Sequence, residues 1–105
     1  MTIADLLKAG LECYQQGNLE AAEKNFRQVV LSDSSNIHGL NLLGMVCVNT
    51  GRHEEAVNLI SQALEINPAD AQAQGNLGLA YQRMGNLKLA ESCFRKSIEL
   101  GGKNR

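Results

Sequence analysis

Few side chains in this sequence have the type and spacing that catalysis or metal binding requires. Of the 105 residues, two are histidines, and neither His38 nor His53 lies in an HExxH motif or beside a Cys-x-x-Cys pair. The three cysteines do not suit a disulfide framework, because their number is odd. Cys13 and Cys47 are expected to be buried as small apolar side chains, and Cys93 to be partly exposed at one end. We therefore expect no metal site and no cofactor.

The carboxylates also lack the arrangement of a catalytic site. Glu20, Glu23, Glu54 and Glu55 fall where helices are expected to begin, and the helix dipole favours acidic side chains there. The sequence contains no G-x-S-x-G motif and no glycine-rich phosphate-binding loop. These observations predict that the chain is not an enzyme.

Instead, small and apolar residues recur with a period of 34 residues. Two glycine columns, one alanine column and one large apolar column are held in all three copies: Gly10, Gly44 and Gly78; Gly17, Gly51 and Gly85; Ala22, Ala56 and Ala90; Phe26, Ile60 and Phe94. A fixed period of this length is the mark of a repeat protein. The first glycine column is expected to face the alanine column, so that two helices can approach closely.

Each copy contains two amphipathic helical patterns, with apolar residues three and four positions apart. Thr2 and Asp5 form a possible capping box, Asp70 is a possible N-cap, and Pro68 ends the helix before it. No segment alternates with period two, so we expect no strand. The expected helices run from Ile3 to the break at Gly17-Asn18, from Leu19 to about Leu31, from about Ile37 to Asn49, from about His53 to Ile66, from about Ala71 to Met84, and from Leu87 to Leu100, before Gly101-Gly102.

The bulk composition restricts the possible partners. The formal net charge is -1 with no block of like charges, which argues against a nucleic-acid-binding face. No apolar run approaches the roughly 20 residues that span a bilayer, and the N-terminus lacks the apolar core of a secretory signal. We therefore expect a cytoplasmic protein with no nucleic-acid partner and no membrane insertion.

The third copy, with Leu77-Gly78-x-x-Tyr81 followed by Ala90-x-x-x-Phe94, resembles the tetratricopeptide repeat family. The resemblance runs from Ile3 to Asn104, and the other copies give Leu43-Gly44-x-x-Cys47 with Ala56-x-x-x-Ile60 and Pro68, and Ala9-Gly10-x-x-Cys13 with Ala22-x-x-x-Phe26. Departures from the pattern are Leu6, Leu40 and Gln74 in the tryptophan column, and Ser34 and Gly102 in the late proline column. The resemblance implies an all-α fold, a right-handed superhelical solenoid of three antiparallel helix pairs. It also implies one domain, 1–105, with repeats 3–36, 37–70 and 71–104.

The resemblance further implies a non-enzymatic module that binds a protein or peptide in a concave groove lined by the first helix of each repeat. Carried over by column, the groove residues are Leu7, Leu11, Tyr14, His38, Asn41, Leu42, Met45, Val48, Asn49, Gln72, Asn76, Leu79, Gln82 and Arg83. An alternative reading places Leu11, Met45 and Leu79 partly in the core between repeats. A clamp for a C-terminal carboxylate would draw on Lys8, Asn41, Asn76 and Arg83, without a second convergent cation. The asparagine ladder of glycosyltransferase-linked repeats is present only at Asn76.

An alternative function is a structural or oligomerisation unit, the N-terminal part of a larger multidomain protein. The last repeat has no further helix after it, and repeat arrays usually need a polar cap at each end. We therefore expect self-association, giving a possible homodimer, through an apolar end formed by Leu89, Cys93, Ile98 and Leu100.

Overall fold

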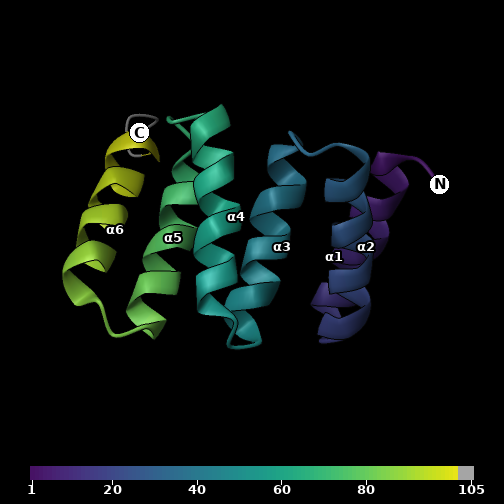
Figure 1. The fold of residues 1–105 in the computed structure, drawn as a ribbon, viewed down its shortest axis with the longest axis horizontal. Coiled ribbons are helices and arrows are strands. Elements are labelled where there is room, and N and C mark those ends of the chain that lie inside the picture. The colour runs from purple at the N-terminus through teal and green to yellow at the C-terminus, as the bar shows by residue number, and fades with distance from the viewer. Residues whose placement is uncertain (102–105) are drawn as a thin grey trace.

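The computed structural model describes residues 1–101, which form six α-helices joined by short turns (Figure 1). The predicted all-α fold is confirmed, and the helix bounds differ from the expected ones by one or two residues. Gly102, and the predicted end of the third repeat at residue 104, lie outside the described residues. The helices are α1 (Ile3–Gln15), α2 (Leu19–Ser32), α3 (Ile37–Asn49), α4 (His53–Ile66), α5 (Ala71–Arg83) and α6 (Leu87–Gly101).

The turn inside each helix pair has the same backbone geometry. Its glycine has a φ of 81° at Gly17, 82° at Gly51 and 83° at Gly85, a conformation that a residue with a Cβ adopts only with strain. The next amide N–H donates to a carbonyl five residues earlier, as in Asn18 to Cys13 at 2.8 Å. The 34-residue period is therefore a period of turn geometry as well as of sequence.

Polar side chains at the helix starts satisfy the free backbone amides. Thr2 and Asp5 form the predicted capping box, with both bonds 3.1 Å long. Asp70 caps α5 as predicted, and Asn18 and Asn36 cap α2 and α3 in the same way. The exception is Arg52 before α4, whose side chain makes no cap and is used elsewhere.

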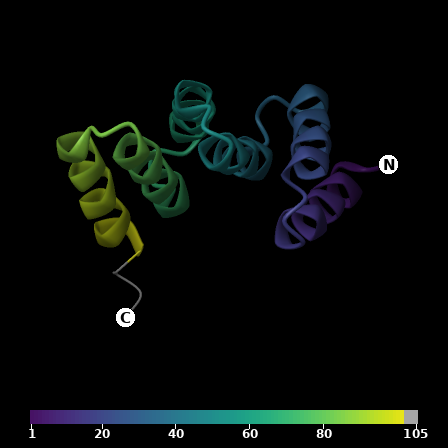
Figure 2. The ribbon, with the colours of Figure 1, turned by 90° about the horizontal axis from the view of Figure 1, so that it is seen from below.

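Seen from below, the three helix pairs form an arc (Figure 2). Helices α2, α4 and α6 lie along the outer side of this arc, and α1, α3 and α5 along its inner side. Each pair is antiparallel, and α2 contacts α3 while α4 contacts α5. Helix α3 also contacts α5, so the inner helices of successive repeats are neighbours.

The core runs through the array, and the middle repeat contributes most of its fully buried side chains. The largest fully buried side chains are Phe26, Leu40, Leu43, Ile60, Val29, Val46, Val48 and Cys47. Helix α3 is buried on most of its circumference because it contacts α2, α4 and α5. Its run Leu40–Val48 is accordingly almost entirely apolar.

The first glycine column packs differently from our prediction. The expected neighbours were the alanines, but a Cβ on Gly78 would lie 2.7 Å from the Phe94 ring, and one on Gly44 would lie 2.7 Å from Ile60 Cγ1. Gly10 has the same relation to Phe26. The glycines therefore make room for the large apolar residue of the facing helix, and the three atoms nearest to the Gly44 position also include the Ala56 carbonyl oxygen.

The cysteines are all free, and two of them are buried. Cys47 is fully buried, and burial raises the pKa of its thiol to about 11, whereas Cys13 is only half-buried. The prediction that Cys93 would be partly exposed is wrong, because it is only 7% exposed and burial raises its pKa as well. The physical reason is its register on α6, where the buried positions are Ala90 and Cys93.

Candidate functional site

Three apolar side chains occupy the same repeat position on the three inner helices. Leu11 of α1 is exposed, and Met45 of α3 and Leu79 of α5 are half-buried. None of the three belongs to the core cluster or packs against it. We call Leu11, Met45 and Leu79 the inner row. The alternative reading, in which they are partly core, fits this arrangement less well than a surface role.

Polar groups flank the inner row at the ends of α1 and α3. The Asn49 amide donates to the Tyr14 hydroxyl oxygen at 2.6 Å, which links the first two inner helices. Other predicted groove residues are exposed and keep their polar groups in solvent: His38, Gln72, Gln82 and Arg83. Leu7 and Leu42 are half-buried and pack against the core, so they offer a partner only part of their surface.

Three of the predicted groove residues are buried: Val48, Asn41 and Asn76. Val48 is 1% exposed and belongs to the core cluster, which corrects its assignment to the groove. Val48 shares its repeat column with Tyr14 and Gln82. These two residues keep some exposure because α1 and α5 belong to the first and third repeats. Helix α3 is covered from both sides, and the same column is therefore buried there.

Two buried asparagines, Asn41 and Asn76, lie on the same helices as Met45 and Leu79, four and three positions earlier in the chain. The Asn41 amide donates to the Asp70 carboxylate at 3.0 Å, and Asp70 also accepts from the backbone amides of Gln72 and Ala73. The Asn41 Oδ1 and Asn76 Nδ2 atoms are buried without a hydrogen-bond partner. Asn41 is thus committed to a carboxylate of this chain, which lowers its value as a ligand for a partner's carboxylate.

The residues predicted for a self-associating end are separated by the structure. Leu89 and Ile98 are exposed on α6, Leu100 is half-buried, and Cys93 is buried. Leu89 occupies the column of Glu55, which reaches back to Arg27 of the preceding repeat. Leu89 therefore shares the column of a residue that points toward the preceding repeat, whereas Leu87 and Ile98 occupy other columns.

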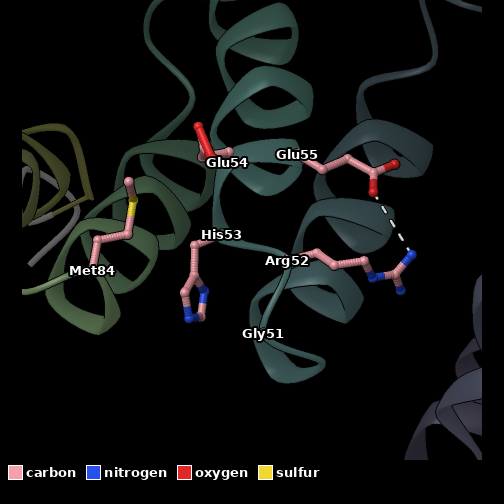
Figure 3. Close-up of a pocket in the computed structure, with 6 residues that line it drawn as sticks. All are labelled: Gly51, Arg52, His53, Glu54, Glu55 and Met84. Carbon is pink, nitrogen blue, oxygen red and sulfur yellow. Dashed lines mark ion pairs between the residues drawn. The ribbon is translucent and has the colours of Figure 1, made fainter.

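A cavity of about 540 Å³ opens where the α3–α4 turn approaches the end of α5 (Figure 3). Its walls are formed by Gly51, Arg52, His53, Glu54, Glu55 and Met84. Arg52 and Glu55 pair with each other at 3.7 Å on one side of the cavity, and Met84 lies on the other. The Nδ1 atom of His53 is buried without a hydrogen-bond partner.

Two of the cavity residues belong to a closed set of ion pairs between the first two repeats. Arg52 binds Glu23 of α2 with both terminal nitrogens, at 2.5 and 2.8 Å, and Arg27 binds Glu23 and Glu55 at 2.8 Å each. We call Glu23, Arg27, Arg52 and Glu55 the charge ring. It joins the outer helices α2 and α4 and carries no net charge.

The charge ring perturbs the titration of its members. The bidentate hydrogen bond from Arg52, with a further bond from Arg27, lowers the pKa of Glu23 to about 2. The same contacts raise the pKa of both guanidinium groups, through Glu55 for Arg27 and through Glu23 for Arg52. Sequence reasoning assigned Glu23 and Glu55 only to helix starts and missed the ring, because the two pairs that join the repeats are between residues 28 and 29 positions apart.

Residues 1–101 contain neither a metal-binding cluster nor a membrane-spanning helix. No three histidine, cysteine, aspartate or glutamate side chains come together there in a way that could hold a metal ion. Over the same residues, no helix has both the length and the apolar character needed to cross a bilayer.

Comparison with known proteins supports the repeat reading of the sequence. A family profile described as tetratricopeptide repeat matches residues 33–103, and another with the same description matches residues 6–36. The protein named "Uncharacterized protein ycf37" from Pyropia yezoensis is 33% identical over 88 residues, covering 82% of this chain and 49% of that protein. The "TPR repeat-containing protein PA4667" of Pseudomonas aeruginosa is 31% identical over 86 residues, covering 81% and 15%. The chain thus spans about half or less of the length of these relatives.

Solved structures share the fold. An O-GlcNAc transferase mutant of Thermobaculum terrenum superposes with a TM-score of 0.92 at 25% identity, over 95% of this chain and 19% of that chain. The second TPR domain of Spaghetti (RPAP3), solved with the HSP90 peptide SRMEEVD, superposes with a TM-score of 0.87 at 20% identity. That match covers 93% of this chain and 91% of the RPAP3 chain, so nearly the whole of both chains follows one architecture.

Proposed function

The chain belongs to the tetratricopeptide repeat family, and from this premise we propose that it is a non-enzymatic, cytoplasmic protein-interaction module. Its partner is a peptide or helix of another protein that lies along the inner helices α1, α3 and α5. The partner contributes apolar side chains at intervals that match the repeats. The proposal concerns this unit alone and leaves out whatever activity a longer protein carries.

The inner row is the observation that carries this proposal. Leu11, Met45 and Leu79 recur at the same position of each repeat, yet they do not contribute to the core. Large apolar side chains that are repeated on a surface and serve no packing role mark a site of interaction. Met45 at the centre of the row has a flexible side chain that adapts to different apolar partners.

The polar surroundings favour a neutral segment over an acidic C-terminus. The RPAP3 domain of the same fold was solved with an acidic peptide, SRMEEVD. In this chain the Asp70 carboxylate accepts the Asn41 amide, so a negative charge lies where a carboxylate clamp would need a free donor. Lys8 and Arg83 remain as cations on the first and last inner helices. We therefore propose recognition by apolar contacts, with amide groups binding the partner backbone.

Selection from a random peptide library displayed on phage, followed by calorimetry with the selected peptides, tests the proposal. Peptides rich in apolar residues should be selected, and the double variant Met45→Glu/Leu79→Glu should lose their binding while it keeps its helical circular dichroism. Leu31→Glu is the matched control, because Leu31 is an exposed apolar residue near the end of α2 and should not affect binding.

Two results would refute this reading. Selected peptides that bind the double variant as well as the wild type would show that the inner row is not the site. Binding of SRMEEVD with an affinity equal to that of the apolar peptides would show that the Asn41–Asp70 bond does not exclude acidic partners.

A second candidate function is oligomerisation through α6. It is favoured by the exposure of the large apolar residues Leu87, Leu89 and Ile98 on this one helix. It is compatible with the first candidate, since α6 lies on the outer side of the arc and leaves the inner helices free (Figure 2).

A further inference from the structure

In each of the first two repeats, one stripe of the second helix is covered by the repeat that follows. On α2 the stripe is Leu19, Glu23, Arg27 and Val30, and all four are half-buried. The same columns on α4 are His53, Val57, Ser61 and Leu64, again half-buried. On α6 they are Leu87, Glu91, Arg95 and Ile98, and all four are exposed. We call these four residues of α6 the end stripe.

The end stripe repeats the chemistry of the α2 stripe. Both read apolar, glutamate, arginine, apolar, with the glutamate and arginine four residues apart. The Glu23 and Arg27 side chains are 21% and 40% exposed because Arg52 and Glu55 of the next repeat pair with them. The Glu91 and Arg95 side chains are 73% and 70% exposed, and among residues 1–101 they pair with each other alone, at 3.6 Å. The end stripe therefore has the charges of a docking surface without the partner charges.

The N-terminal repeat of a second copy does not supply those charges. In the columns of Arg52 and Glu55, the first repeat has Asn18 and Ala21. In the column of Gly39, which packs closely on Val29 of the preceding repeat, α1 carries the charged capping residue Asp5. Head-to-tail stacking of copies is therefore disfavoured, and with it the open filament that such stacking would produce.

The order of residues in the end stripe is self-complementary when two helices pair in antiparallel fashion. A two-fold axis near residue 93 brings Glu91 of one copy opposite Arg95 of the other, and Leu87 opposite Ile98. At a rise of about 1.5 Å per residue, Leu87 and Ile98 lie about 8.6 and 7.9 Å on either side of the midpoint, so the pairs meet at the same height. We propose that the end stripe binds the end stripe of a second copy, forming a two-fold dimer through α6 with two reciprocal Glu91–Arg95 ion pairs.

This inference deepens the second candidate function and is independent of the inner row. The proposed dimer contact is formed by the end stripe. Leu89 and Cys93, which were predicted for the self-associating end, are not part of this contact. Because a two-fold contact uses the same patch on both copies, it closes after two chains.

Complementary charge reversal tests the pairing in the intact chain. Glu91→Arg should leave a stripe with two positive charges, and Arg95→Glu one with two negative charges. Each variant alone should self-associate about tenfold or more weakly than the wild type in sedimentation equilibrium, because like charges then face each other. An equimolar mixture of the two should restore association, and the double variant Glu91→Arg/Arg95→Glu should dimerise like the wild type. Lys88→Glu is the control, since Lys88 is exposed on α6 outside the stripe.

Three outcomes would overturn the proposal. A wild type that stays monomeric across the concentration series would refute both self-association and the two-fold contact. Association that is unchanged in Glu91→Arg and Arg95→Glu would keep oligomerisation as a function but remove it from the end stripe. Single variants that are weakened but are not restored by mixing would indicate a contact with a different face. Circular dichroism of each variant checks that the helices are intact, and Ile98→Lys provides an independent disruption of the same contact.

Discussion

Replacing Glu23 by glutamine should destabilise the chain much more than the same replacement at Glu91, although the two residues occupy the same repeat column. Glu23 receives a bidentate hydrogen bond from Arg52 and further bonds from Arg27, and its side chain is 21% exposed. Within the part of the chain that the structure describes, Glu91 pairs with Arg95 alone, at 3.6 Å on an exposed helix surface. The chain therefore contains its own control for the effect of burial and of a second arginine.

The magnitude follows from the pKa of Glu23. A fall from the ordinary value of 4.5 to about 2 corresponds to at most about 3 kcal/mol of stabilisation of the folded state. Solvent screens part of this, because the Arg27 and Arg52 side chains are 40% and 36% exposed. We expect Glu23→Gln to lower the free energy of unfolding at pH 7 by about 1.5 kcal/mol, and Glu91→Gln by less than about 0.5 kcal/mol.

The effect should depend on pH in a known direction. Between about pH 4.5 and pH 2 the unfolded chain binds a proton at Glu23 while the folded chain does not, so protonation favours unfolding. The stabilisation is fully present above pH 4.5 and is lost as the pH falls toward 2. Urea unfolding followed by circular dichroism, at pH 7 and at several lower values, measures this for the wild type and both variants.

Two results would refute the reasoning. Equal losses of stability for Glu23→Gln and Glu91→Gln at pH 7 would show that the charge ring is no stronger than an ordinary surface pair. A Glu23→Gln variant that loses stability between pH 4.5 and 2 as steeply as the wild type would show that other carboxylates cause the acid sensitivity.

Two further predictions concern the core. Gly78→Ala should lower the free energy of unfolding by about 1–3 kcal/mol, because the new methyl group would lie 2.7 Å from the Phe94 ring. Gly75→Ala on the same helix is the control: its methyl group would lie 3.3 Å from the Ser97 hydroxyl oxygen, and its effect in urea unfolding should be close to zero. Equal effects of the two substitutions would contradict this packing. With a thiol reagent at pH 8, Cys47 should react only as fast as the chain opens, because its thiol is buried and has a pKa of about 11. Half-buried Cys13 should react first, and mass spectrometry of partly labelled protein distinguishes the two.

Features that depend on neighbouring residues in the chain could be predicted from the sequence. The helix starts at Thr2 and Asp70 were predicted because a capping side chain binds backbone amides only two or three residues away. The turns at the glycines followed from their spacing and from the tolerance of glycine for positive φ. Sequence period and local chemistry were sufficient for the six helices and their pairing.

Features that depend on how the repeats pack were missed or misplaced. Column matching put Val48 in the groove because it treats all repeats as equivalent, and Cys93 was expected to be exposed because it lies in the third repeat, at one end of the array. In the structure α3 is covered on both sides, which buries Val48, and the register of α6 turns Cys93 inward. The sequence does contain one indication of the charge ring and the end stripe: Glu23 and Arg27 recur in the same columns as Glu91 and Arg95. This recurrence predicts an ion pair or an exposed surface only when the residues that cover each stripe are known.

The near-identical turn glycines have a mechanical consequence. With φ values of 81°, 82° and 83° at Gly17, Gly51 and Gly85, the three hairpins share one turn geometry, so the curvature of the arc depends chiefly on the two junctions between them. The first junction has the charge ring and the Asn49–Tyr14 hydrogen bond, and the second has the Asn41–Asp70 hydrogen bond. Salt screens the attraction between two charged groups more than a hydrogen bond from a neutral amide, so ionic strength should weaken the charge ring more than the Asn41–Asp70 bond. The curvature presented to a partner is thus adjustable at one point of the array and comparatively fixed at the other.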